Sequence, residues 1–314
     1  MRDFFHACKT SPRTYDLPGM FTGTHTALVT PFMKDGRVDE PRLRQLIEQQ
    51  IAAGIDGLVP CGTTGESPTL SHEEHNHVIE LVVKFAAGRC KVIAGTGSNS
   101  TDEAIDMTQR AKKAGAGATL QVAPYYNKPS QAGLYAHFRA IAEDGGLPVV
   151  LYNIPGRCGV DISNETVAKL RRDLPKSIVG LKEATGVVDR VSQLRALVDR
   201  DFCILSGDDS LTLPMISVGA VGVISVASNV VPREVTEMTH AALKGDFERA
   251  GRIHAKLFPI FKDLFIETNP VPVKAALAMM GVIEEKYRLP LVPMSEANRA
   301  QLKKTLQALS LVKA

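Results

Sequence analysis

Residues 149–182 read VVLYNIPGRCGVDISNETVAKLRRDLPKSIVGLK, in which two short apolar runs enclose an amphipathic stretch. The runs at 149–152 and 178–182 are rich in β-branched residues and predict strands, whereas residues 167–170 have the spacing of a helix. A strand–helix–strand order of this length predicts two parallel strands joined by a right-handed crossover.

The same alternation recurs along most of the chain. Apolar runs lie at residues 25–29, 57–60, 92–94, 119–123, 149–152, 178–182, 203–206 and 221–226. Eight such units fit a doubly wound sheet or a closed (β/α)8 TIM barrel. No G-x-G-x-x-G motif follows the first run, and Gly95-Thr96-Gly97 lacks the third glycine, so we expect the barrel.

Local signals divide the chain further. Ser71–Glu74 and Ser100–Glu103 have the S-x-x-E spacing of capping boxes and predict helix starts. After residue 245 only helical patterns follow, at 246–264, 271–280 and 295–311. We therefore expect a barrel domain at 20–245 and an attached C-terminal helical domain at 246–314. Residues 1–19 lack the apolar core of a signal peptide and are expected to form a flexible leader.

Composition excludes several classes of partner. Lys and Arg number 37 against 34 Asp and Glu, Trp is absent, and aromatic residues make up 5%. This balance does not favour nucleic-acid binding. No run approaches the roughly 18 apolar residues that span a bilayer, so we expect no membrane partner. The five cysteines are scattered without C-x-x-C spacing, which fits a reducing, cytoplasmic compartment.

Lys182 ends the apolar run 178–181 and should project into the barrel mouth, where TIM-barrel active sites form. A lysine at a strand end can simply extend its amine to water. In a partly apolar cavity, however, desolvation disfavours the ammonium form and frees the amine for a Schiff base. A pKa lowered by about three units would supply roughly 4 kcal/mol toward deprotonation.

Further polar residues follow the other predicted strands at the same end. Tyr152 and Tyr126 could transfer protons, with Thr63 as a link, although packing is the plain alternative for each tyrosine. The turn GTTG at 62–65 offers N–H groups to a small carboxylate, and Arg157 could bind a second one. The alternative for the two threonines is an ordinary turn without a ligand, and the alternative for Arg157 is a solvated surface arginine.

Four separated motifs carry a resemblance to a known family. They are Gly62-Thr63-Thr64-Gly65-Glu66, Pro124-Tyr125-Tyr126-Asn127, Tyr152-Asn153-Ile154-Pro155 and Gly180-Leu181-Lys182-Glu183-Ala184-Thr185-Gly186. In this order they resemble the dihydrodipicolinate synthase (4-hydroxy-tetrahydrodipicolinate synthase) family of pyruvate-dependent class I aldolases. The similarity spans residues 21–311, including the helical tail at 269–274, and leaves out the leader.

The resemblance implies a reaction. Lys182 would condense with pyruvate to an imine, which loses a methyl proton and becomes an enamine. The enamine would attack the aldehyde of L-aspartate 4-semialdehyde, and cyclisation would release 4-hydroxy-tetrahydrodipicolinate for lysine and diaminopimelate synthesis. No metal or organic cofactor is expected, because the lysine itself supplies the electron sink.

The resemblance also implies roles for further residues. Tyr152, Thr63 and Tyr126 would relay protons, Thr64 would bind the pyruvate carboxylate, Arg157 would bind the semialdehyde carboxylate, and Gly207 and Ile224 would contact pyruvate. Tyr126 would reach into a neighbouring subunit, which implies a homotetramer built as a dimer of dimers.

A second site is implied near the first predicted capping box. The cluster at residues 72–77 is not H-E-x-x-H, and a polar first helical turn explains it, with Glu74 as the capping residue. Glu103 has a similar explanation in its own capping box. The resemblance instead implies feedback inhibition by L-lysine, bound by Ser67, His72, His75, Asn99, Glu103 and Tyr125. Pro68 departs from the small residue often found at its position in the family.

Two other functions stay open at this point. N-acetylneuraminate lyase and 2-keto-3-deoxy sugar acid aldolases would use Lys182 and Tyr152 equally well, but sialic acid lyases usually lack an arginine at the position of Arg157. A catalytically inactive barrel kept as a small-molecule sensor or scaffold is the alternative from another class.

Overall fold

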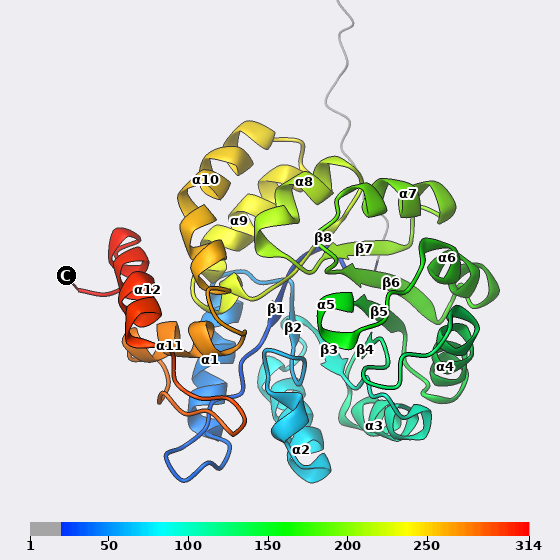
Figure 1. The fold of residues 1–314 in the computed structure, drawn as a ribbon, viewed down its shortest axis with the longest axis horizontal. Helices are drawn as coiled ribbons and strands as arrows, with labels where there is room; N and C mark the ends of the chain where they lie inside the picture. The colour runs from blue at the N-terminus through cyan, green and yellow to red at the C-terminus, as the bar shows by residue number, and fades with distance from the viewer. Residues whose placement is uncertain (1–19, 314) are drawn as a thin grey trace, which may run out of the picture.

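The computed structural model describes residues 20–313, and the expected leader at 1–19 lies outside them. Eight parallel strands pair in chain order, and β8 returns to pair with β1 (Figure 1). The predicted (β/α)8 TIM barrel is therefore confirmed. No helix within the described residues is long and apolar enough to cross a membrane.

The strands match the predicted apolar runs closely. They are β1 Gly23–Ala27, β2 Gly57–Val59, β3 Lys91–Gly95, β4 Ala118–Val122, β5 Val149–Asn153, β6 Ile178–Glu183, β7 Cys203–Ser206 and β8 Gly222–Ser225. β4 is displaced by one residue and β1 by two: β1 begins at Gly23, whose N–H donates to the Val221 carbonyl at 2.9 Å, and it ends before Leu28.

Helices surround the barrel and continue beyond it. The α-helices are α1 Glu40–Ala52, α2 His72–Ala86, α3 Thr101–Ala114, α4 Gln131–Asp144, α5 Pro155–Cys158, α6 Asn164–Asp173, α7 Asp189–Leu197, α8 Thr212–Ser217, α9 Pro232–Leu243, α10 Phe247–Asp263, α11 Val271–Met279 and α12 Glu296–Ala308. Short 3₁₀ turns lie at η1 Ser67–Thr69, η2 Asp209–Leu211 and η3 Ala227–Asn229.

The two predicted capping boxes have different outcomes. At the start of α2 the Ser71 hydroxyl accepts from the Glu74 N–H at 3.2 Å, and the Glu74 carboxylate accepts from the Ser71 N–H at 3.0 Å, so this box is confirmed. At the start of α3 Ser100 accepts from the Glu103 N–H at 3.4 Å, but its own N–H donates to Ser98 at 3.1 Å. The second capping box is therefore wrong in one of its two hydrogen bonds: the Glu103 carboxylate does not accept from the Ser100 N–H, because it bonds other partners.

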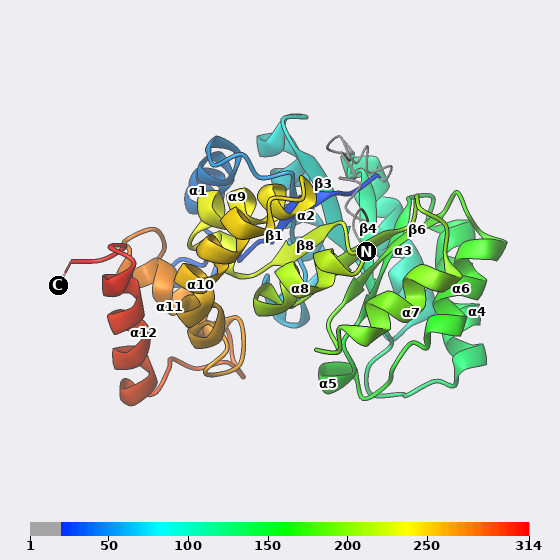
Figure 2. The ribbon, with the colours of Figure 1, turned by 90° about the horizontal axis from the view of Figure 1, so that it is seen from above.

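The C-terminal helices α10, α11 and α12 lie together on one side of the barrel, with α12 outermost (Figures 1 and 2). They begin and end within a few residues of the predicted helical patterns. Helix α10 packs against α9 and α12, and apolar side chains of all three join the same hydrophobic core as the barrel. The division of the chain at 245/246 stays a prediction.

Candidate active site

Two reactive side chains meet at the carboxyl ends of β5 and β6. The strand register pairs Tyr152 with Lys182 and Asn153 with Glu183. Neighbouring side chains of a strand point to opposite faces, so Tyr152 and Lys182 share one face. Both are buried, and the Lys182 Nζ lies 4.1 Å from the centroid of the Tyr152 ring.

The surroundings of Lys182 favour a neutral amine. Burial lowers the pKa of Lys182 from 10.5 to about 7; the Asp209 carboxylate opposes this lowering, and the Arg157 guanidinium adds to it. An amine with a pKa of about 7 is neutral in about half of the molecules at neutral pH, which a nucleophile for a carbonyl carbon requires.

Tyr152 is held in its protonated form. Burial raises the pKa of Tyr152 to about 12, although the nearby Arg157 charge and the Thr63 side chain act in the opposite direction. A phenol that keeps its proton can donate it, and a hydroxyl partner can continue the path.

The loop after β2 presents two threonines on a tight turn. The Gly65 N–H donates to the Gly62 carbonyl at 3.0 Å, and the Glu66 N–H donates to the Thr63 carbonyl at 3.1 Å. Within residues 20–313 the N–H groups of Thr63 and Thr64 have no acceptor. This turn therefore has free donors for a small anion, as the GTTG sequence predicted.

The C-terminal segment completes this loop. Asn269 Nδ2 donates to Thr64 Oγ1 at 3.0 Å, and the Asn269 carbonyl accepts from Arg157 Nη2 at 3.0 Å. Arg157 lies on α5 and is exposed, so its remaining donors are accessible at the rim of the barrel.

Gly207 and Ile224, the two further residues expected to contact pyruvate, lie in the loop after β7 and in β8. The Gly207 N–H donates to the Glu183 carbonyl at 2.7 Å, and a Cβ at this position would lie 2.6 Å from the Ala184 Cβ. This close approach of backbones requires a glycine. Ile224 is buried in β8. Their contacts with pyruvate stay predictions.

Tyr126 does not join the other proposed relay residues within one chain. Its side chain is 90% exposed, and its backbone is left-handed with φ 73°. Tyr125 beside it is also exposed, although it lines the cavity described next.

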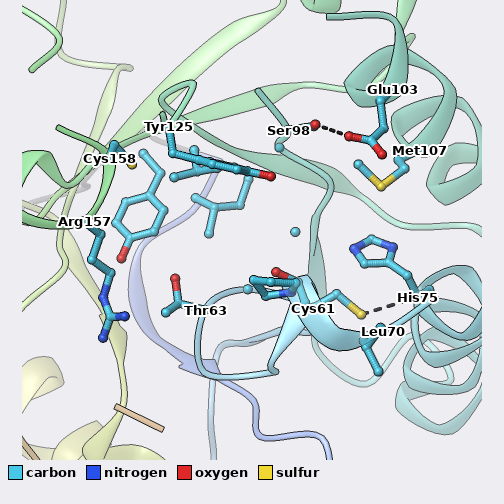
Figure 3. Close-up of a pocket in the computed structure, with 18 of the residues that line it drawn as sticks. Cys61, Thr63, Leu70, His75, Ser98, Glu103, Met107, Tyr125, Arg157 and Cys158 are labelled. Atoms are coloured by element: carbon cyan, nitrogen blue, oxygen red, sulfur yellow. Dashed lines mark hydrogen bonds between the residues drawn. The ribbon is translucent and has the colours of Figure 1, made fainter. Parts of the chain in front are cut away.

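A cavity of about 380 Å³ is lined by part of each group of predicted residues, although not by Lys182 itself (Figure 3). Thr63, Tyr152 and Arg157 line it together with five of the residues expected to bind lysine, namely Ser67, His72, His75, Glu103 and Tyr125. Asn99, the sixth, does not line the cavity but donates from Nδ2 to the Tyr125 carbonyl at 3.2 Å. Figure 3 shows Thr63 and Arg157 at one side of the cavity and His75 and Glu103 at the other.

Glu103 is the acidic group of this cavity. Its carboxylate accepts from the Ser98 hydroxyl and lies 2.7 Å from the His72 Nε2. Burial lowers the pKa of His75 to about 4, so this imidazole is neutral, and its Nδ1 has no hydrogen-bond partner within the described residues. The histidine cluster is therefore divided, with His75 turned inward and His77 paired outside with Glu40 at 2.9 Å.

Several residues around the site had no role in the sequence prediction. Asn269 belongs to the tail motif at 269–274, but only the structure brings it to Thr64. Lys274 of the same motif forms a fully buried ion pair with Glu66. Asp209 is buried beside the end of β8, where it accepts from the Ser225 hydroxyl at 2.5 Å and from two backbone N–H groups at 3.0 Å. The three donors to Asp209 are 16 or more residues away in sequence, so local patterns carry no signal for these contacts.

Comparisons with known proteins identify the family of the chain. The sequence profile of the Dihydrodipicolinate synthetase family matches residues 20–309. The chain belongs to this family. The 4-hydroxy-tetrahydrodipicolinate synthase of Sulfurihydrogenibium sp. (strain YO3AOP1) is 55% identical over 295 residues, which cover 94% of this chain and 100% of the relative. The chain is accordingly an enzyme of this kind, a lyase that serves lysine and diaminopimelate biosynthesis.

Two solved dihydrodipicolinate synthases with ligands share the fold. The chloride-inhibited enzyme from Acinetobacter baumannii, complexed with pyruvate, has a TM-score of 0.90 and 45% identity, covering 93% of this chain and 99% of that chain. The enzyme from Cyanidioschyzon merolae with lysine bound has a TM-score of 0.90 and 43% identity, covering 94% of this chain and 100% of that chain.

Proposed function

We propose that Lys182 is the Schiff-base nucleophile that condenses pyruvate with L-aspartate 4-semialdehyde. The neutral amine adds to the pyruvate carbonyl, and loss of water gives an iminium ion. Loss of a methyl proton gives the enamine, whose carbon attacks the aldehyde. The amino group of the semialdehyde then displaces Lys182 as the ring closes. The observation that carries this proposal is the buried Lys182 amine over the ring of Tyr152.

Proton transfer is assigned to Tyr152 and Thr63, with Tyr126 as a third member. Tyr152 and Thr63 line the same cavity, and the Thr63 side chain acts to lower the pKa of Tyr152, which supports the first link of this relay. The phenol can donate to the carbonyl oxygen that leaves as water and accept protons in later steps.

Two groups of hydrogen-bond donors are proposed to orient the two substrates by binding their carboxylates. The free N–H groups of Thr63 and Thr64 and the Thr64 hydroxyl are proposed to bind the pyruvate carboxylate. The accessible donors of Arg157 are proposed to bind the carboxylate of the semialdehyde, since a guanidinium can hold a carboxylate with two parallel hydrogen bonds.

The exposed Tyr126 supports an assembly of several chains. A large aromatic side chain that is 90% exposed at the rim of an active site can be covered by a second copy of the chain. We propose that Tyr126 enters the site of a neighbouring subunit and that the enzyme is a homotetramer built as a dimer of dimers. We place the enzyme in the cytoplasm, a location that the free thiols of Cys61, Cys90 and Cys158 support.

Feedback inhibition by L-lysine is proposed at the far end of the cavity. The Glu103 carboxylate offers a counter-charge for the effector's ammonium group, and the unpartnered Nδ1 of His75 offers a further polar contact. The lysine-bound relative supports this proposal. Glu103→Gln should raise the lysine concentration needed for inhibition while Asp102→Asn, exposed one residue earlier on α3, should not.

A substrate comparison tests the proposed reaction. The purified enzyme is given pyruvate with L-aspartate 4-semialdehyde and, separately, N-acetylneuraminate or a 2-keto-3-deoxy sugar acid. We expect consumption of the semialdehyde and little cleavage of the sugar acids. Cleavage of N-acetylneuraminate without activity on the semialdehyde would assign the site to the sialic acid lyases instead.

A further inference from the structure

The residues that follow Tyr152 and Lys182 are joined on the outer face of the barrel. Asn153 and Glu183 are paired in register at the ends of β5 and β6, and both are buried. Because side chains alternate along a strand, each points away from the face that carries its catalytic neighbour.

Asp161 and Arg190 connect these two residues. Asn153 Nδ2 donates to Asp161 Oδ1 at 2.7 Å, and Arg190 Nη1 donates to Asp161 Oδ2 at 3.1 Å. Arg190 Nε donates to Glu183 Oε2 at 3.2 Å, and its Nη2 donates to the Ile162 carbonyl at 2.7 Å. We call Asn153, Asp161, Glu183 and Arg190 the outer polar network.

The network fixes each strand end to a loop that follows it. The Ile162 N–H donates to Asn153 Oδ1 at 3.0 Å, which ties β5 to the loop before α6. The Thr185 N–H donates to Glu183 Oε1 at 2.8 Å, which ties β6 to the loop before α7. Arg190 on α7 joins the two, so neither strand end can twist or slide without breaking charged hydrogen bonds.

A twist of either strand end would move the inner pair. Tyr152 and Lys182 are each one residue from a member of the network, and the contact of the Lys182 amine with the Tyr152 ring depends on the relative orientation of the two strands. A displacement of about 1 Å at reacting groups can cost about a hundredfold in rate.

We propose that the Asp161–Arg190 bridge is a positioning element that holds the Lys182 amine over the Tyr152 ring. The inference rests on the proposed role of Lys182 in imine formation. Neither Asp161 nor Arg190 touches the reacting atoms; they act through the backbones of β5 and β6.

A second ion pair of similar construction provides the matched control. At the opposite, amino end of β6, Arg171 Nη1 donates to the Ile178 carbonyl at 3.0 Å, and its Nε and Nη2 donate to Asp199 at 2.7 and 2.9 Å. The side chains of Arg171 and Asp199 are 11% and 50% exposed, against 17% and 47% for Arg190 and Asp161. Loss of Asp161 or of Asp199 should therefore have a similar effect on stability, whereas Arg190→Gln also removes the ionic partner of the buried Glu183.

The experiment compares Arg190→Gln and Asp161→Ala with Arg171→Gln and Asp199→Ala. Each variant is measured for Tm, for kcat and KM, and for the pH dependence of borohydride trapping of pyruvate on Lys182. Asp161→Ala is informative even if Arg190→Gln does not fold, because Asp161 is half exposed and its loss leaves the Glu183–Arg190 pair in place.

We expect the two network variants to lose about tenfold or more in kcat, with the midpoint of imine trapping moved to higher pH as the amine becomes more hydrated. In the two control variants Tm should fall, while kcat and the midpoint of imine trapping should stay unchanged. Asp161→Asn, which keeps an acceptor for Asn153, should recover part of kcat relative to Asp161→Ala.

Equal kcat and equal trapping midpoints in the network and control variants would overturn the inference. Failure of the wild-type enzyme to form any pyruvate adduct on Lys182 is a different result, since it would overturn the proposed function itself.

Discussion

Lys182 and Lys274 are both buried, and burial lowers the pKa of each. Their surroundings nevertheless give them different chemistry. Lys274 is fully enclosed and ion-paired with Glu66, so the carboxylate stabilises its ammonium form, in which the nitrogen lone pair carries a proton. Lys182 faces an aromatic ring at the barrel mouth, which stabilises an ammonium less than a carboxylate does. Of these two lysines, Lys182 is the one whose amine lies against a residue that lines the cavity, Tyr152.

Asp209 opposes the lowering of the Lys182 pKa, and this gives a test with a defined sign. Asp209→Asn removes the negative charge, so the pKa of Lys182 should fall further and imine formation should begin at lower pH. The same charge is available to stabilise the positive iminium ion, so kcat should fall. The midpoint is read from borohydride trapping of pyruvate between pH 5 and 9.

Asp208→Asn is the control for this measurement. Asp208 is the neighbouring carboxylate, which accepts from the Ser210 N–H at 2.8 Å, and it does not contribute to the shift at Lys182. An upward shift of the midpoint in Asp209→Asn, or the same shift in both variants, would contradict the electrostatic role of Asp209.

The β2–α2 loop is an element that depends on a distant helix. Its Thr63 lines the cavity, whereas Glu66 in the left-handed region, with φ 55°, turns away to meet Lys274 of α11. Asn269 adds a second tie to Thr64 just before α11. The C-terminal helices thus hold an active-site loop.

Lys274→Met should destabilise the protein by about 3–5 kcal/mol, because it leaves the buried Glu66 carboxylate without its cation and with the Arg288 N–H at 3.3 Å as its remaining donor. The free energy of unfolding is measured by denaturant titration, and KM for pyruvate should rise as the loop loosens. Adding Glu66→Gln to Lys274→Met should recover part of the stability. Lys169→Met, which removes an exposed pair with Asp173, should leave stability nearly unchanged; a similar loss there would contradict the argument.

Elements of this kind show what could be predicted from sequence. Apolar runs located all eight strands, because burial on both faces of a parallel sheet leaves a local signature. The same is true of the capping box at Ser71. The role of Glu103 was not predictable from its S-x-x-E spacing, since Ser98 and His72 compete with the cap for its carboxylate. The outer polar network was also missed, because its hydrogen bonds join four separate segments of chain that only the closed barrel brings together.

The whole molecule has one feature that a single chain does not explain. Tyr126, a proposed member of the proton relay, lies on the surface, whereas Tyr152 and Thr63 line the cavity. Assembly with a second copy would bring a tyrosine to each site from the other chain. Each complete active site would then contain residues from two chains.

Hybrid assemblies test this arrangement. A chain with Tyr126→Phe and a chain with Lys182→Ala are each expected to have little activity alone. In a hybrid dimer, the site with native Lys182 would receive native Tyr126 from the other chain, so up to about half of the sites should regain activity. The two chains are co-expressed with different tags and purified through both. No recovery over the parent variants would show that Tyr126 acts within its own chain or not at all.

The most direct test of the account is covalent trapping of the imine. The enzyme is mixed with pyruvate, reduced with borohydride, digested and analysed by mass spectrometry. We predict one reduced pyruvyl adduct, on the peptide that contains Lys182, with no adduct on Lys274 and none in Lys182→Ala. A folded enzyme without an adduct, or with the adduct on another lysine, would contradict the assignment of Lys182 as the nucleophile.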